Sequence, residues 1–184
     1  MRAPTNYAGP RRKVPKPKQV SQSLESGLPK EAATVRGVLD AKADEGTGAR
    51  RGGNDVVWVR KSDSVQHAVE RLHEERIGAV VVLDSAGRLE GILSERDVVR
   101  ALPGIDHDLC DVPVERLMTR GVTTCSPDTP LAHVLATMSE KRFRHMPVME
   151  HGQLVGIVTI GDVVNHRIKE LEREALSIKQ VIVG

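Results

Sequence analysis

The sequence predicts an α/β fold of the α+β type, in which two copies of a strand–helix–strand–strand–helix unit pack face to face with pseudo-twofold symmetry. The first observation behind this is an internal repeat. Segment 91–97 (GILSERD) returns as 156–162 (GIVTIGD), so the motif glycines and aspartates each recur after 65 residues. A repeat must be recognised before the fold is assigned, because each copy is expected to form the same structural unit. The second observation is size: a unit of roughly 60 residues buries only about 60% of its unfolded surface, so two copies are expected to share an interior, with a cleft between their sheets.

A matched pair of amphipathic helices is the third observation. In each unit, apolar residues recur at i, i+3, i+4 and i+7, which places them on one helix face. They are Val65, Ala68, Val69 and Leu72 in the first unit and Leu131, Val134, Leu135 and Met138 in the second. Residues 63–64 and 128–129 are N-cap candidates for these helices, and Pro130 suits a first helical turn.

Short apolar runs supply the strands. The expected strands are 56–59 and 77–83 in the first unit and 122–125 and 143–149 in the second. Turn residues at 84–87 and 150–152 predict that each longer run forms a hairpin with the motif strand that follows it. The second helix of each unit then begins near the motif aspartate, Asp97 or Asp162.

The last helix is expected to continue from Asp162 to about residue 182. Its apolar residues recur at spacings of 4, 3, 4, 3 and 4, which is a heptad-like seam. They are Val164, Ile168, Leu171, Ala175, Ile178 and Ile182. The seam can pack on its own core or on a partner subunit, and the length of the helix favours the partner.

Four segments follow from these patterns. Residues 1–30 form a basic tail expected to be disordered, 31–104 the first repeat, 105–113 a linker, and 114–184 the second repeat with its C-terminal helix. The tail is rich in proline and poor in apolar residues. It is interpreted as a solvated tail, with nucleic-acid or anionic-surface contact and a mitochondrial transit peptide as alternatives. Residues 43–54 are expected to form a long loop, and 106–108 a solvated loop rather than a metal site.

Composition narrows the function classes. The chain has 184 residues, which is too short for a barrel enzyme. Its formal charge of +2 gives no strong electrostatic preference for a partner. No apolar run reaches the ~18 residues that span a membrane, and two cysteines indicate a reducing compartment, so a cytoplasmic protein is expected. Cys125 is expected to be a buried, inert thiol, with a redox switch as the alternative. Three aromatic residues are too few for nucleic-acid stacking, so nucleic-acid binding is not expected.

The hydroxyl–aspartate pair at the end of each motif has two interpretations. Thr159 and Asp162 can form a capping box that satisfies backbone N–H groups. The same pair suits a nucleotide, because a helix N-terminus attracts phosphate and a carboxylate accepts two hydrogen bonds from ribose hydroxyls. Arg144 and His145 favour the nucleotide, since a core strand needs neither, with surface charge on an edge strand as the alternative. The aligned residues of the first unit, Gly78 and Ala79, carry no charge.

Taken together, these residues resemble a pair of CBS domains, also called a Bateman module. The resemblance rests on 91–97, 156–162, 144–148 (RHMPV) and 114–119 (VERLMT), covers about 33–182, and is nearest to small stand-alone bacterial proteins of the family. Leu39-Asp40 stands where the family often has Met-Thr. The resemblance implies ribose and phosphate roles for the hydroxyl–aspartate pair, base contacts near Met146, and dimerisation into a flat disc.

Two inequivalent nucleotide sites are therefore expected, and the second is expected to take nucleotide more readily because the first is less basic. The second site comprises Thr124, Arg144, His145, Met146, Pro147, Thr159 and Asp162. The first site comprises Val59, Gly78, Ala79, Val80, Ser94, Arg96 and Asp97.

The function expected is a non-catalytic sensor that binds AMP, ADP, ATP, NAD(H) or S-adenosylmethionine as a regulatory ligand and signals to an unknown effector protein, as a homodimer. No required cofactor and no metal site are expected. The sequence shows no nucleophile paired with a base, no metal spacing and no phosphate-cradling glycine loop, so an enzyme is not expected. The alternatives are a ligand-independent interaction scaffold and nucleic-acid binding through the tail.

Overall fold

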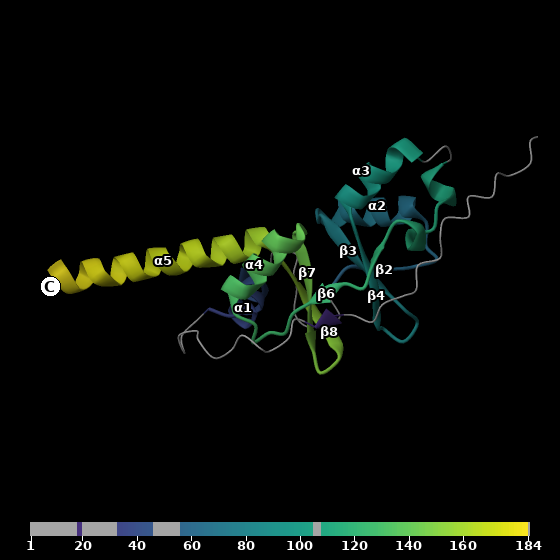
Figure 1. Cartoon of the computed structure of the whole chain (residues 1–184). Helices are drawn as coiled ribbons and strands as arrows, with labels where there is room; N and C mark the ends of the chain where they lie inside the picture. The colour runs from purple at the N-terminus through teal and green to yellow at the C-terminus, as the bar shows by residue number, and fades with distance from the viewer. Residues whose placement is uncertain (1–17, 20–32, 46–55, 105–107, 184) are drawn as a thin grey trace, which may run out of the picture.

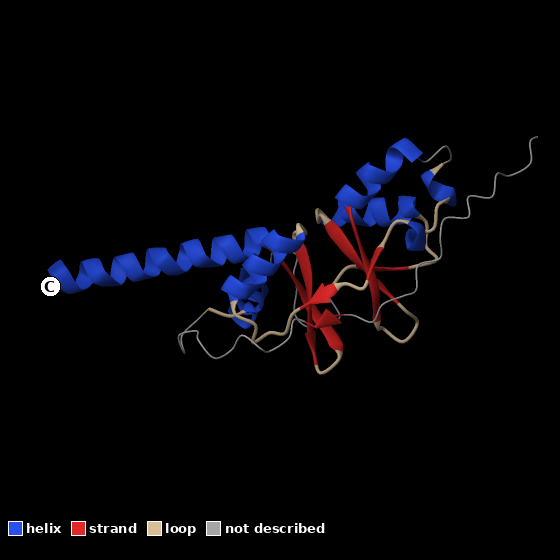
Figure 2. Ribbon diagram, viewed as in Figure 1, coloured by secondary structure: helices blue, strands red, loops and turns tan. Residues whose placement is uncertain are grey.

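The fold consists of two similar halves whose sheets lie toward the centre of the molecule and whose helices lie outside (Figures 1 and 2). The computed structural model describes residues 18–19, 33–45, 56–104 and 108–183. Most of the predicted basic tail, most of the 43–54 loop and residues 106–107 lie outside the described residues. The described parts differ from the prediction, because residues 18–19 of the tail form a strand that pairs in parallel with 123–124 and residues 43–45 are helical. The predicted α+β class is confirmed, with the expected order of strands and helices in both halves.

Each half contains the strand–helix–strand–strand–helix unit. The first is β2 (Trp58–Arg60), α2 (Val65–Glu75), β3 (Ala79–Leu83), β4 (Leu89–Ser94) and α3 (Glu95–Ala101). The second is β6 (Thr123–Thr124), α4 (Leu131–Lys141), β7 (His145–Glu150), β8 (Gln153–Thr159) and α5 (Ile160–Val183). The elements outside the units are β1 (Lys18–Gln19), α1 (Val35–Glu45), β5 (Thr119–Arg120) and three short 3-10 turns, η1 (Leu102–Gly104), η2 (Leu109–Asp111) and η3 (Val114–Arg116).

The hairpins of the two halves have matching registers. β3 and β4 are antiparallel and pair Ala79 with Ser94, while β7 and β8 are antiparallel and pair His145 with Thr159. In the first half, β2 joins β3 in parallel and β5 joins β4, which gives the order β2-β3-β4-β5. The register brings the hydroxyl residue of each motif to the end of its hairpin, where the next helix begins.

Helix boundaries follow local chemistry. The side chain of Ser64 caps α2 by accepting a hydrogen bond from the backbone N–H of His67 at 3.1 Å, as its position before the apolar stripe predicted. At the other end, Arg76 and Arg142 close α2 and α4 in left-handed conformation, with φ of 53° and 57°. Both turn the chain directly into the strand that follows.

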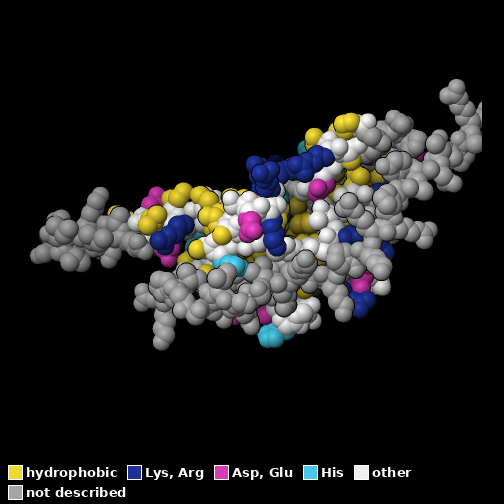
Figure 3. Space-filling view, viewed as in Figure 1, with side chains coloured by type: hydrophobic (Ala, Val, Ile, Leu, Met, Phe, Trp, Pro, Cys, Tyr) yellow, Lys and Arg dark blue, Asp and Glu magenta, His cyan; other side chains and the backbone are white. Residues whose placement is uncertain are grey.

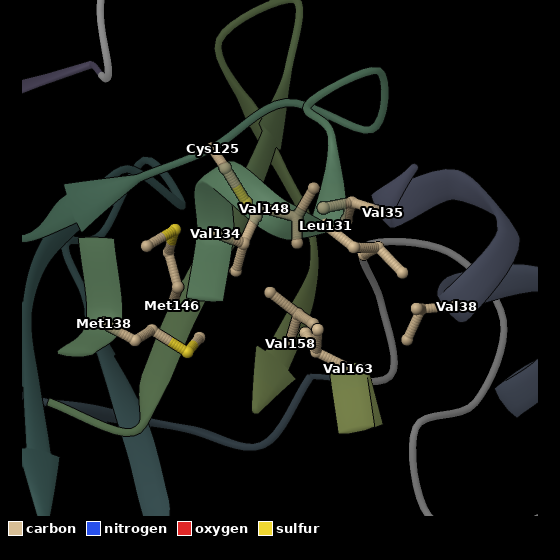
Figure 4. Packing of buried hydrophobic residues seen from close by; sticks show 10 residues of the cluster. All are labelled: Val35, Val38, Cys125, Leu131, Val134, Met138, Met146, Val148, Val158 and Val163. Atoms are coloured by element: carbon tan, nitrogen blue, oxygen red, sulfur yellow. The ribbon is translucent and has the colours of Figure 1, made fainter. Parts of the chain in front are cut away.

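Each half has its own hydrophobic core, completed by a segment from elsewhere in the chain. The core of the second half includes Val35 and Val38 of α1, which are 0% and 2% exposed (Figure 4). The core of the first half includes Val114 and Met118, which follow the linker. The sequence predicted that residues 31–104 form one unit, but α1, near the start of that range, packs in the core of the second half.

Backbone pairing explains this exchange of segments between the halves. Thr34 bridges to Pro130, and Ser64 bridges to Pro113, so each incoming segment is fixed at the start of the other half's first helix. The segments are too short to bury their own valines, so they bury them against a helix and a hairpin of the other half, which removes this apolar surface from water.

Cys125 bridges to Val148 and is 5% exposed. Burial raises the pKa of its thiol to about 12, so the group is protonated at neutral pH, as a buried inert thiol requires. None of the described helices combines the length and the apolar character that crossing a membrane requires.

Candidate functional site

Both hydroxyl–aspartate pairs form capping boxes at helix N-termini. At α5, the backbone N–H and the hydroxyl of Thr159 donate to Oδ2 of Asp162 at 2.7 and 2.8 Å, and Thr159 Oγ1 accepts from the backbone N–H of Asp162 at 3.1 Å. At α3, the backbone N–H and hydroxyl of Ser94 donate to Oδ2 of Asp97 at 2.9 and 2.5 Å. The capping interpretation therefore holds. Ligand binding is compatible with it, because the described bonds use only one oxygen of each carboxylate, Oδ2.

Each pair opens into its own cleft between the halves. The large cleft, which contains Thr159 and Asp162, has a volume of about 1040 Å³. Its walls come from α1, from 56–57 and 75–79 of the first half, and from β8 and α5 of the second. The basic cleft, which contains Ser94 and Asp97, has a volume of about 340 Å³ and is closed by the chain around Thr119–Thr123 and by 141–145 of the second half. Both volumes suit a small-molecule site.

The clefts regroup the predicted site residues. Gly78 and Ala79, expected with Ser94, line the large cleft beside Asp162, although Gly78 also reaches the basic cleft. Arg144, expected with Thr159, lines the basic cleft together with Arg96. The reason is that the halves face each other, so the β3 start of one half lies against the helix N-terminus of the other. Pairing by repeat cannot show this.

Five further predicted residues line neither cleft. Val59, Val80 and Met146 are core residues that are 1%, 0% and 0% exposed. Thr124 is 1% exposed, and Pro147 is buried opposite Ile157 in the β7–β8 hairpin. The side chains of Val59, Val80 and Met146 point into the two cores, and Pro147, as the next residue after Met146 in β7, lies on the opposite face of the hairpin.

The charge of the two clefts is opposite to the expectation. Among the described residues, the basic cleft is lined by five Lys or Arg residues and two carboxylates. They are Arg96, Arg100, Lys141, Arg142 and Arg144, with Glu95 and Asp97. The described lining of the large cleft holds four Lys or Arg residues and four carboxylates, so its formal charge is balanced. Lys and Arg side chains gather on the visible face beside α3 (Figure 3).

His145 separates the two clefts and lines both. Its ring lies against Gly78, where an added Cβ would come within 3.1 Å of Nε2. Burial lowers the pKa of His145 below its usual value, while the carboxylates of Asp162 and Glu95 oppose that shift. A neutral imidazole therefore stands between the acidic groups of the two clefts at neutral pH.

Sequence analysis missed Lys42 of α1 as a site residue. Its ammonium donates to Asp162 Oδ2 at 2.6 Å and to the carbonyl oxygen of Ile157 at 3.2 Å. It also missed Arg100, Lys141 and Arg142 of the basic cleft. Arg100, three residues after Asp97, could have been recognised from its closeness to the motif. Lys42 could not, because it lies 120 residues from Asp162 and only the packing of α1 brings the two together.

The comparisons with known proteins agree with this architecture. A model of the CBS domain matches residues 53–104 and 114–169. The chain is 37% identical over 108 residues to the "Uncharacterized 17.7 kDa protein in bps2 3'region" of Acidianus ambivalens, covering 58% of this chain and 64% of that protein. It thus spans slightly less than two thirds of that relative's length.

Solved structures show the same fold. The CBS-domain containing protein ATU1752 from Agrobacterium tumefaciens is 38% identical with a TM-score of 0.65, over 73% of this chain and 99% of that one. The CBS domain pair of protein MJ0100, solved in complex with 5'-methylthioadenosine and S-adenosyl-L-methionine, is 29% identical with a TM-score of 0.54, over 60% of this chain and 89% of that one. Because the family model matches over half of the chain, once in each half of the fold, this chain belongs to the CBS-domain family and carries a tandem pair of CBS domains.

Proposed function

We propose that this chain is a non-catalytic regulatory module that binds an adenosine nucleotide between its CBS domains and signals occupancy to a partner protein by a change in the angle between them. The observation that carries the proposal is the capped carboxylate at the N-terminus of a helix in each cleft. The complex of MJ0100 with two adenosine compounds supports the class of ligand.

The basic cleft supplies what a phosphorylated nucleotide needs. The free oxygen of Asp97 can accept ribose hydroxyls, because the described bonds to this carboxylate all end on Oδ2. The excess of arginine and lysine can neutralise phosphate, and arginine binds phosphate in a fork geometry that lysine lacks. We therefore assign AMP, ADP, ATP or NAD(H) to this cleft rather than the cationic S-adenosylmethionine.

Binding between the halves also provides a route to an output. Arg96 on α3 already donates from Nη1 to the carbonyl oxygen of Arg142 at 3.2 Å, which links the first half to the second across the basic cleft. Phosphate that draws Arg96 and Arg142 together alters this contact. A coupling of only about 1–3 kcal/mol is sufficient for regulation.

The direct test is a thermal-shift screen of the full chain with AMP, ADP, ATP, NAD, NADH and S-adenosylmethionine. A ligand at 100 times its Kd stabilises by about 2.7 kcal/mol, which corresponds to a rise in Tm of about 5–10 °C for a chain of this size. We expect the phosphorylated nucleotides to give the largest rise, and that rise to shrink with added salt. A Tm that none of the six compounds raises would favour the interaction scaffold instead.

Helix α5 suggests how the module pairs with a second copy. It extends away from both cores (Figure 1), and Val164, Ile168 and Leu171 on it are 41%, 48% and 49% exposed. The distal seam side chains predicted at 175, 178 and 182 lie outside the described side chains. We propose that the exposed apolar stripe buries against the same stripe of a second chain, as heptad spacing permits.

Light scattering tests this pairing. The full chain should show twice the monomer mass, and the double variant Ile168→Lys, Leu171→Lys should reduce it to the monomer mass because two lysines would face each other in the seam. Lysine at Val99, which is 63% exposed on α3, is the matched control and should leave the mass unchanged. A monomeric full chain would contradict the pairing.

A further inference from the structure

The Lys42–Asp162 ion pair occupies the carboxylate that a ribose would need in the large cleft. The ammonium of Lys42 lies 2.6 Å from Oδ2, and the two side chains are only 18% and 20% exposed. A second hydrogen bond, to the carbonyl oxygen of Ile157, holds the ammonium in place. Restricted exposure makes such a pair less screened by solvent than a surface pair.

The two motif aspartates differ because of this lysine. Asp162 Oδ2 accepts three hydrogen bonds among the described residues, two from Thr159 and one from Lys42. Asp97 Oδ2 accepts two, both from Ser94, and no described cation lies on it. None of the described hydrogen bonds ends on Oδ1 of either aspartate, so a ribose that uses both oxygens competes with an ammonium at Asp162 but only with the capping bonds of Ser94 at Asp97.

The pseudo-twofold symmetry shows where this difference comes from. The backbone N–H of Val35 donates to Thr129 at 3.0 Å, and that of Val114 donates to Asp63 at 2.8 Å, so the two valines are equivalent positions. From there the two segments diverge: α1 continues as a helix through Lys42 to Glu45, whereas the other segment leaves its 3-10 turn at Arg116 and extends into β5, which is followed by Gly121. Gly121 lines the basic cleft and has no side chain with which to reach Asp97.

Packing of α1 fixes Lys42 in this place. Val38 is buried in the core of the second half, and an added Cβ at Gly156 would lie 2.7 Å from Cδ2 of Leu39. The glycine of the second motif thus accommodates the turn of α1 that precedes Lys42. Lys42 lies before residue 53, where the match to the CBS domain begins, so the contact belongs to an extension of the domain pair.

We propose that Lys42 is a built-in competitor for the ribose site of the large cleft. An adenosine compound binds there only when the Lys42–Asp162 pair opens, whereas the basic cleft accepts nucleotide without such a step. The inference rests on the proposed function. It adds that the basic cleft fills before the large cleft. It also adds that a ligand in the large cleft displaces Lys42 and thereby affects the last turn of α1.

The test measures adenosine and AMP binding by calorimetry in proteins that carry Asp97→Ala, which removes the carboxylate of the basic cleft. Adding Lys42→Met should tighten adenosine binding by about tenfold, because the ligand no longer displaces an ammonium from the carboxylate. Lys42→Gln is the second variant, in case methionine disturbs folding. Lys61→Met removes a lysine paired with Glu90 at 2.8 Å outside both clefts and should change nothing.

Amine footprinting gives a readout that does not depend on a variant. In the full native chain, acetylation of Lys42 should be slow without ligand and faster at saturating adenosine. Weaker or unchanged adenosine binding in Lys42→Met overturns the proposal, as does stronger protection of Lys42 by ligand, which would make the lysine a ligand contact. If the native chain binds no adenosine compound in either cleft, the proposed function fails together with the Lys42 proposal. If it binds one but Lys42→Met does not tighten adenosine binding, only the Lys42 proposal fails.

Discussion

Replacement of Val35 by aspartate is expected to destabilise the second CBS domain far more than the first. Val35 is 0% exposed and belongs to the core formed by α4, β7, β8 and α5 (Figure 4). A carboxylate at this position has no described cation in that core to pair with, so the variant should lose about 4 kcal/mol or more of unfolding free energy. For a chain of this size, that loss lowers Tm by about 8–16 °C.

Hydrogen exchange locates the effect. Amides of β7 and β8 should lose protection, while those of β3 and β4 keep most of theirs, because the first core is completed by Val114 rather than by α1. Arg36→Gln is the matched control, since Arg36 is the next residue of α1 and its ion pairs with Asp128 and Glu150 lie at the surface. Equal loss of protection in both hairpins, or loss confined to β3 and β4, would contradict the exchanged arrangement.

This exchange marks the boundary of what the sequence could predict. Periodicity identifies a buried face, as it did for Val65 and Leu72 on α2, and it identifies the turn that follows a strand. Periodicity does not say which half of the molecule covers that face. Val35 and Val114 are both buried, yet nothing local distinguishes a segment that packs on its own repeat from one that crosses to the other.

The same limit explains the regrouped clefts. The capping box was one of the two interpretations of the Thr159–Asp162 pair, and it could be recognised from sequence because it depends only on residues three apart. The repeat predicted the wrong charge for the clefts, since Arg144 and Lys141 act in the cleft of the opposite repeat. The face-to-face packing was predicted from size and symmetry, but its consequence for side-chain neighbours depends on which strand end meets which helix, and that is a property of the assembled pair.

The crossed arrangement has a functional consequence. Each cleft is built from both halves, and His145 with Gly78 forms a wall common to the two clefts. Under the proposed function, a ligand in either cleft would contact both CBS domains, and a ligand that moved this wall would change the shape of the other cleft. A repeat that kept its site to itself would have no such contact through which occupancy could alter the angle between domains.

Nucleotide binding in the basic cleft should fall by about 100- to 10,000-fold in Asp97→Ala, since two charge-assisted hydrogen bonds to ribose are lost at about 1.5–3 kcal/mol each. The measurement is calorimetric titration of ATP and AMP into the native chain and the variant. The variant also loses its capping box, which costs about 0.5–2 kcal/mol of stability. Asp63→Ala is therefore the matched control: Asp63 accepts a hydrogen bond from the backbone N–H of Arg60 at 2.7 Å and lines neither cleft.

The location of the loss decides between the clefts. If ATP affinity survives Asp97→Ala and disappears in Asp162→Ala, the nucleotide occupies the large cleft, and the excess of arginine around Asp97 serves another purpose. If Asp97→Ala abolishes ATP binding while Asp162→Ala leaves it intact, ATP occupies the basic cleft. This is the result expected if the five basic residues of that cleft determine where ATP binds. Adenosine, which has no phosphate, should then lose less affinity than ATP when Arg144 is replaced by glutamate, because only the phosphate contacts depend on that charge.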